Sequence, residues 1–155
     1  MAVVNIARFT ELKGNKAGFL DTALPGGAKE NLKLIGRGSS ENPMPAAIPG
    51  DHGYVMNWVR IPPGGGSRLH FHPTQEVFIP IDGSLTIYWL DASGEQFSFA
   101  ATPRDCVSVE GGVMRGFRND GASEALMLTI VTGHDAGGPL VWHSDVVTEQ
   151  KALQP

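Results

Sequence analysis

Residues 64–83 read GGGSRLHFHPTQEVFIPIDG, and both the fold and the chemistry of the chain depend on this stretch. His70 and His72 are two positions apart in a short segment, so on a β-strand their side chains leave the same face. A Pro-Thr pair interrupts the strand, and Glu76 begins the next segment with the same parity. Two imidazoles and one carboxylate on one face suit Fe(II), Mn(II), Ni(II) or Zn(II) and leave coordination positions open. The stretch therefore predicts a divalent metal site formed by His70, His72 and Glu76.

Short apolar segments alternate with turn residues along the rest of the chain. The 155 residues include 20 glycines and 11 prolines, a punctuation typical of all-β sandwiches and barrels. Asp82-Gly83 is the strongest hairpin signal. The pattern predicts an all-β fold, a double-sheet jelly roll or closed barrel. Strands are expected at 31–35, 54–61, 68–72, 75–81, 84–90, 96–100, 105–109, 114–118 and 124–132.

One domain is expected to span the whole chain, because no repeat, linker or low-complexity tract divides it. An irregular N-terminal arm is expected over residues 1–53, the barrel core over 54–132 and a tail over 133–155. Within the tail, residues 140–147 are expected to be extended, with a closing helical turn near Glu149.

Composition limits the classes of partner. The formal net charge is −4 and no run of Lys or Arg occurs, which argues against a nucleic-acid partner. No apolar stretch approaches the length of a membrane span, and the N-terminus lacks the pattern of a signal peptide. A single cysteine, Cys106, excludes an internal disulfide and is expected to be a buried small hydrophobic residue. We therefore expect a cytoplasmic protein with a small-molecule partner and no membrane or nucleic-acid partner.

Glycines at fixed distances extend the histidine pattern. Gly64 precedes His70 by six positions, and Gly83 follows Glu76 by seven. The run Gly64-x5-His70-x-His72-x3-Glu76-x6-Gly83 resembles the first motif of the cupin superfamily at every defining position. The resemblance covers residues 54 to about 132 and implies a cupin-type double-stranded β-helix, or jelly-roll barrel. It also implies a homodimer, with the N-terminal arm and the edge strands as the natural contact.

A second stretch, residues 104–119, reads RDCVSVEGGVMRGFRN and lies where cupins have their second motif. Arg104 and Glu110 stand where the family usually has Gly and Pro. Arg115 stands where the family usually has a histidine, its fourth metal ligand. The positions that match the family motif are Asp105, Gly112, Phe117 and Asn119, and the last of these is expected to hold a turn.

Arg115 leaves three arrangements open. Arginine keeps its proton in proteins, so Arg115 is not a replacement ligand. A divalent ion bound by two histidines and one carboxylate has a net charge of about +1. The charge of Arg115, if about 5 Å from that ion, is repelled by roughly 3 kcal/mol at an effective dielectric constant of 20. In the first arrangement Arg115 grips an anionic substrate while the metal binds another substrate oxygen. In the second no metal is bound and Arg115 pairs with Glu76. In the third Arg115 points away from the cavity and is structural.

The remaining candidate residues have simpler interpretations. His52, His134 and His143 fall in loops or the tail and are expected at the surface, with His143 as the one to examine as a substitute ligand. Large apolar residues on the expected strands are interpreted as core. Phe78 is the best candidate for a pocket wall, because it shares the parity of Glu76. The other residues interpreted as core are Met56, Trp58, Trp89, Phe97, Phe99, Met114 and Phe117.

The resemblance and the donor set together predict a metal-dependent enzyme. We expect a dioxygenase-type oxidoreductase, with iron as the first metal to consider and Mn, Ni or Zn as alternatives, acting on a small anionic or aromatic compound. In this hypothesis Arg115 is the candidate catalytic residue and orients an anionic group. Two alternatives use the same residues: a non-oxidative isomerase or lyase, and a non-catalytic small-ligand-binding cupin without metal and with an Arg115–Glu76 ion pair.

Overall fold

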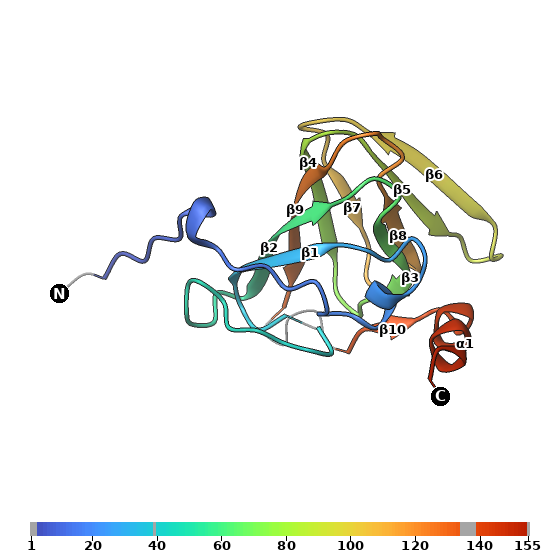
Figure 1. Cartoon of the computed structure of the whole chain (residues 1–155), viewed down its shortest axis with the longest axis horizontal. Helices are drawn as coiled ribbons and strands as arrows, with labels where there is room; N and C mark the ends of the chain where they lie inside the picture. Colours follow the sequence, from blue (N-terminus) through green and yellow to red (C-terminus); the bar gives the residue numbers. More distant parts are fainter. Residues whose placement is uncertain (1–2, 39, 134–138, 155) are drawn as a thin grey trace.

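Two five-stranded antiparallel sheets form the body of the protein in the computed structural model, which describes residues 3–38, 40–133 and 139–154 (Figure 1). One sheet has the strand order β1-β2-β9-β4-β7 and the other the order β10-β3-β8-β5-β6. The predicted jelly-roll barrel is therefore confirmed. The strands are β1 (Glu30–Ile35), β2 (Tyr54–Ile61), β3 (Gly66–Phe71), β4 (Glu76–Asp82), β5 (Leu85–Leu90), β6 (Gln96–Ala101), β7 (Val107–Val109), β8 (Arg115–Arg118), β9 (Ala125–Thr132) and β10 (Val141–Trp142).

Alternating strands of the first sheet place one set of side chains inside the barrel. Along β2, β4 and β9 every second residue is buried, as a sheet with one covered face requires. The apolar core fills the end of the barrel that contains Val59 and Ile61, and each large side chain buried there contributes about 1.5–3 kcal/mol. The other members of this core are Phe78, Leu85, Ile87, Ala101, Val109, Phe117, Ala125 and Met127.

The two glycines of the first motif both adopt a backbone conformation that other residues rarely adopt. Gly83 has φ +74° in the turn between β4 and β5, and Gly64 has φ +73° before β3. A side chain at either position would force the strained left-handed conformation on an L-residue. The motif glycines therefore set the turns that bring the two histidines and Glu76 to their places.

The C-terminal segment differs from the prediction. After the short strand β10 the chain forms α1 (Ser144–Ala152), where an extended segment followed by a single helical turn was expected. The His143 ring caps this helix by accepting from the Asp145 amide at 3.4 Å. Asp145 in the first turn and Lys151 in the last complement the helix dipole, and Val146 is buried. These end signals, rather than any hydrophobic period, mark the helix.

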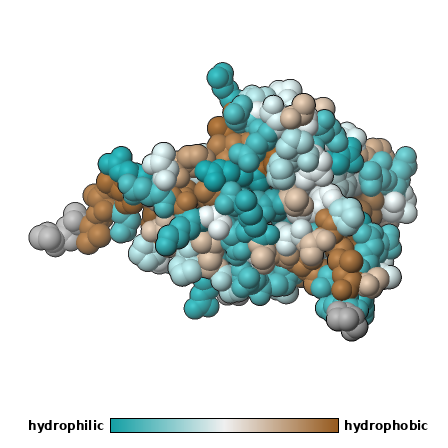
Figure 2. Space-filling model, in the orientation of Figure 1, coloured by the Kyte–Doolittle hydropathy of each residue, from teal (hydrophilic) through white to brown (hydrophobic). Residues whose placement is uncertain are grey.

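The N-terminal arm contains two short 3-10 helices, η1 (Phe9–Glu11) and η2 (Leu20–Ala23). Residues 3–8 extend away from the barrel (Figure 1), and the apolar side chains along them are exposed, as Figure 2 shows. The segment from η2 to β1 is anchored by a buried ion pair, in which Lys29 Nζ lies 2.6 Å from Asp21 Oδ1. In the described part of the chain, no helix has both the length and the apolar character needed to cross a membrane.

Several interpretations of apolar residues as core are wrong. Met56 and Trp58 are half-buried, because they lie on the outward parity of β2. Cys106 is exposed, because it lies in a surface turn just before β7. Phe97 and Phe99 are also exposed, because β6 is the edge strand of its sheet and nothing among the described residues covers its outer face. Phe97 instead stacks on Trp89 of the neighbouring strand, with ring centroids 6.2 Å apart.

Candidate metal centre

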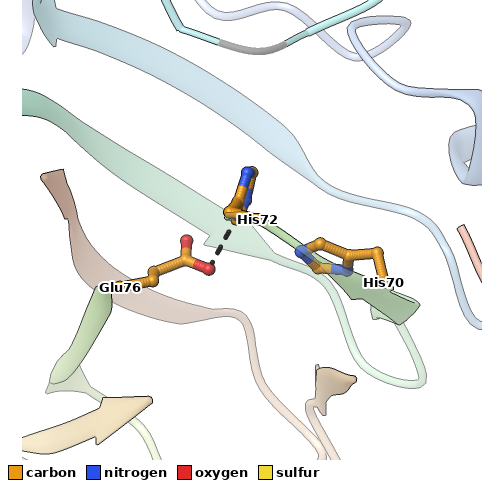
Figure 3. A group of neighbouring side chains, drawn as sticks. All are labelled: His70, His72 and Glu76. Atoms are coloured by element: carbon orange, nitrogen blue, oxygen red, sulfur yellow. Dashed lines mark ion pairs between the residues drawn. The ribbon is translucent and has the colours of Figure 1, made fainter. Parts of the chain in front are cut away.

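Three side chains with metal-binding atoms meet where the two sheets face each other. His70 lies on β3, His72 follows the end of that strand, and Glu76 is the first residue of β4 in the opposite sheet. All three side chains are buried, and their donor atoms lie within 4.8 Å of one another. Figure 3 shows them pointing toward one another, with His72 Nε2 3.6 Å from Glu76 Oε2. The predicted donor group is thus brought together by the fold.

The hydrogen bonds of His70 define which ring nitrogen is available. Nδ1 of His70 lies 2.8 Å from the backbone oxygen of Arg68, and a carbonyl oxygen only accepts hydrogen bonds. The proton of the neutral ring is therefore on Nδ1, and Nε2 keeps its lone pair. Metal-binding histidines are oriented in this way by a backbone carbonyl on the other nitrogen.

Both histidines are held in the neutral form that binds metals. Burial lowers the pKa of His70 well below its ordinary value of 6.5, and the charges of Arg115 and His72 lower it further. Burial also lowers the pKa of His72, and Arg115 adds to this effect while Glu76 opposes it. A metal requires deprotonated ligands, so two neutral imidazoles beside a carboxylate fit a divalent transition ion.

Arg115 lies directly behind this group and is fully buried, with 0% of its surface exposed. It stands on β8 opposite His70 in the pairing with β3. Its Nε and Nη2 atoms donate to Glu76 Oε2 at 3.1 and 2.7 Å, and Nη1 donates to the Val113 carbonyl at 3.2 Å. The alternative in which Arg115 points away from the site is therefore wrong. The ion pair with Glu76, which the second alternative required, is present.

A small cavity of about 50 Å³ adjoins the three donor residues. At about 10–15 Å³ for each water, this space holds roughly three to five water-sized groups. Apolar side chains, including Val55, Val131 and Trp142, form part of the wall. Arg115 does not belong to the described lining, so it acts on the cavity through Glu76. The geometry provides room for a small molecule in contact with the donors.

Polar residues on the first sheet form part of the cavity wall, and the sequence interpretation missed them. Asn31, Asn57 and Thr129 line the cavity from β1, β2 and β9. A signal was present in β2, because Asn57 is a polar residue at inward parity between Val55 and Val59. The sequence did not predict that these three strands pair with one another, since their pairing depends on the strand order of the sheet.

The other candidate residues lie elsewhere. His143 caps α1, His52 is exposed, and His134 lies outside the described residues. Phe78 does not line the cavity but packs in the core against Phe117, with ring centroids 5.6 Å apart. Asn119 holds a turn, as predicted: its Nδ2 donates to two backbone carbonyls at 2.8 Å, and its Oδ1 accepts from a backbone amide at 2.9 Å.

Comparison with known families and with curated proteins gives one match and one negative result. Residues 57–131 match the Cupin domain family. No curated protein matches the chain. The matched segment contains the histidine pair, Glu76 and Arg115.

Solved structures share the fold at low sequence identity. The polyketide cyclase RemF from Streptomyces resistomycificus is 16% identical, with a TM-score of 0.64 and coverage of 96% of this chain and 94% of RemF. An oxalate oxidase in complex with the substrate analogue glycolate is 22% identical, with a TM-score of 0.62 and coverage of 96% and 74%. The cysteine peptidase peruvianin-I from Thevetia peruviana latex is 18% identical, with a TM-score of 0.51. That match covers 55% of this chain and 53% of peruvianin-I, so this chain spans about half the length of peruvianin-I.

Proposed function

The chain belongs to the cupin superfamily, and from this premise we propose that it is a metal-dependent enzyme acting on a small molecule. The observation that carries the proposal is the buried group of His70, His72 and Glu76 beside a cavity. The reaction that we favour is a dioxygenase-type oxidation with iron as the metal. The fold likeness to an oxalate oxidase supports oxidation, although the low identity assigns no substrate.

Each of the three donors has a defined role in this proposal. His70 through Nε2, His72 and the Glu76 carboxylate would hold the ion. When bound, a divalent transition ion supplies Lewis acidity and, as Fe(II), reactivity toward O₂. The Arg68 carbonyl keeps the His70 ring in its binding orientation by accepting from Nδ1. The apolar part of the wall limits the water that reaches the site.

Arg115 is assigned here as a positioning residue that acts through Glu76. Its two hydrogen bonds to Oε2 fix the carboxylate, and its charge compensates that of Glu76. A divalent ion, Glu76 and Arg115 together carry a formal charge of about +2, higher than in a site without the arginine. A site of this charge favours a substrate with an anionic oxygen. The proposal therefore keeps the anionic substrate that was expected from the sequence.

A second candidate is a non-oxidative reaction, such as an isomerisation, cyclisation or elimination, carried by the same donors. The match with the cyclase RemF favours it, since that likeness extends over nearly the whole of both chains. Oxygen uptake distinguishes the two candidates.

The experiment measures metal content by mass spectrometry on protein purified without a His-tag or added metal. We expect near-stoichiometric metal in the wild-type protein and in a His52→Ala/His143→Ala control. The His70→Ala/His72→Ala variant should lose it. Oxygen uptake with small carboxylate and phenolic compounds, compared with product formation under anaerobic conditions, then separates the oxidative from the non-oxidative reaction. Absence of metal from the wild-type protein, even after anaerobic reconstitution with Fe(II), would leave the metal-free binding protein as the remaining interpretation.

A further inference from the structure

Two buried amide oxygens in the cavity wall have no hydrogen-bond donor among the described residues. They are Oδ1 of Asn31 and Oδ1 of Asn57, and the two residues are only 7% and 8% exposed. Both side chains line the cavity next to the candidate metal centre. Buried polar atoms are normally paired, and leaving one unpaired costs folding free energy. Two such atoms on one cavity wall indicate that a bound ligand supplies the missing hydrogen-bond donor.

The strand register places these amides beside the donor group. Asn57 pairs with Thr129 on β9, and two residues along the same strands Val55 pairs with Val131. Val131 in turn pairs with Glu76 on β4. Two residues along a strand span about 7 Å, so Asn57 lies one inward row away from the metal donors. Asn31 pairs with Val59 and so lies one row further along the wall; the two residues are called the amide pair below. A molecule of a few heavy atoms is long enough to touch both the metal donors and Asn57.

The hydrogen bonds already made within the wall define what the amides still lack. Asn57 Nδ2 lies 3.5 Å from Thr129 Oγ1, which directs the amide nitrogen to its neighbour and leaves Oδ1 open. The two lysines of the wall already have acceptors. Lys29 donates to Asp21 and to two backbone carbonyls, and Lys33 donates to the Arg37 carbonyl. The buried lining atoms that still lack a hydrogen bond are therefore the two amide oxygens, which are acceptors.

We propose that the amide pair recognises a hydroxyl group of the substrate, whose one proton is donated to the open oxygen of Asn57, with Asn31 next to it. A carboxylate oxygen placed against these amide oxygens would bring lone pairs against lone pairs, whereas a hydroxyl supplies the donor that they lack. The inference rests on the proposed function, which places an anionic oxygen at the metal donors. The substrate class is then a small hydroxy acid, with its acidic group at His70, His72 and Glu76 and its hydroxyl at Asn57 of the amide pair.

Thermal unfolding tests whether the two amides serve the fold or the ligand. Leucine has nearly the shape of asparagine and no polar atoms, so Asn31→Leu and Asn57→Leu should keep or raise the melting temperature. The control is Asn119→Leu, which removes an amide whose hydrogen bonds are made and should lower it clearly. A fall in either test variant as large as in the control, or failure of either to fold, would overturn the proposal.

Calorimetric titration with two probe acids tests the recognition itself. 3-Hydroxypropanoate and propanoate share the acidic group and differ by one hydroxyl. We expect the wild-type protein to bind the hydroxy acid more tightly by about three- to tenfold, the usual effect of one neutral hydrogen bond. Asn57→Leu should abolish this preference and leave the affinity for propanoate unchanged. Equal affinities in the wild-type protein, binding of neither acid, or an unchanged preference in the variant would each contradict the proposal.

Metal analysis of the same samples separates this inference from the proposed function. A hydroxyl preference in protein that takes up no metal would overturn the metalloenzyme and retain the amide site. Bound metal without a hydroxyl preference would overturn the amide site and retain the metalloenzyme.

Discussion

Arg104 is the residue whose backbone conformation conflicts most with its side chain. It has φ 77°, and it is the one non-glycine residue with positive φ in the part of the chain that the structure describes. It occupies the position where the family motif usually has glycine, in the turn before β7. Its amide donates to the Pro80 carbonyl at 2.9 Å, so the turn is held in place despite the strain.

Arg104→Gly is expected to stabilise the protein. A left-handed L-residue costs about 1–2 kcal/mol, and glycine's extra backbone entropy offsets roughly half of this. We expect the free energy of unfolding to rise by about 1 kcal/mol, or about 2–4 °C in melting temperature for a chain of this length. Arg104→Ala is the control, because it removes the charge and keeps the Cβ atom. Equal melting temperatures of the two variants would refute the strain argument.

At the residue scale, the metal donors were predictable and their surroundings were not. His70, His72 and Glu76 lie within seven positions, so strand parity predicts that all three side chains point inward, although Glu76 does so from the opposite sheet. The ion pair of Arg115 with Glu76 joins residues 39 positions apart on strands of different sheets. For this reason the orientation of the Arg115 side chain could not be predicted from the sequence.

Among the elements, α1 depends on side chains from outside the helix for its position. It lies against η2, and its Glu149 carboxylate is bound by the Arg68 guanidinium of β3 through two hydrogen bonds of 3.0 and 2.8 Å. Arg68 is also the residue whose carbonyl orients His70. The helix and the metal centre thus share one residue of β3.

The contribution of the Arg68–Glu149 pair to stability should disappear in acid. The hydrogen bonds from Arg68 lower the pKa of Glu149 below its ordinary value of 4.5. The pair therefore contributes stability above pH 4.5 and loses it as the pH falls through the lowered pKa of the folded protein. Glu149→Gln should be slightly less stable than wild type in urea at pH 7, with a difference that vanishes in acid and shrinks in high salt.

Glu110→Gln is the matched control, since it removes an exposed carboxylate that lies outside α1. If it changed stability with pH in the same way as Glu149→Gln, the ion pair would not be the cause.

The accuracy of the predicted element boundaries depended on how strong the local sequence signals were. The bounds of β2 match the prediction, because its alternation runs without interruption to a Pro-Pro-Gly stop. The helix α1 was underestimated, because its sequence SDVVTEQKA has one buried apolar residue and weak periodicity. Predicting the amide pair would have required the strand order β1-β2-β9, which local patterns do not encode.

On the scale of the whole molecule, the chain has an exposed apolar arm over which no described residue packs closely. Val3, Val4 and Ile6 are 80%, 80% and 74% exposed on an extended segment (Figure 2). Isolated exposed apolar residues are common, but several in succession on a projecting arm indicate a contact with another molecule. We propose that this molecule is a second copy of the chain, in line with the homodimer expected from the family resemblance.

Light scattering after gel filtration tests the dimer. We expect the wild-type chain to have twice the monomer mass, and Val4→Asp/Ile6→Asp to be a monomer with unchanged secondary structure. Gln150→Asp/Gln154→Asp, which adds the same charge on α1 and just after its end, at the other end of the molecule (Figure 1), should remain a dimer. A monomeric wild-type protein would refute the proposed contact.

The metal donors and the polar residues of the cavity wall differ in how far apart they lie along the chain. The metal donors come from one strand–turn–strand segment of seven residues, and so require the closure of only a short loop. The polar part of the wall joins Asn31, Asn57 and Thr129, which meet only when β1, β2 and β9 have paired. The cost in chain entropy differs accordingly. Bringing the donor group together closes one short loop, whereas the polar residues that would face a substrate meet only when distant strands of the barrel pair.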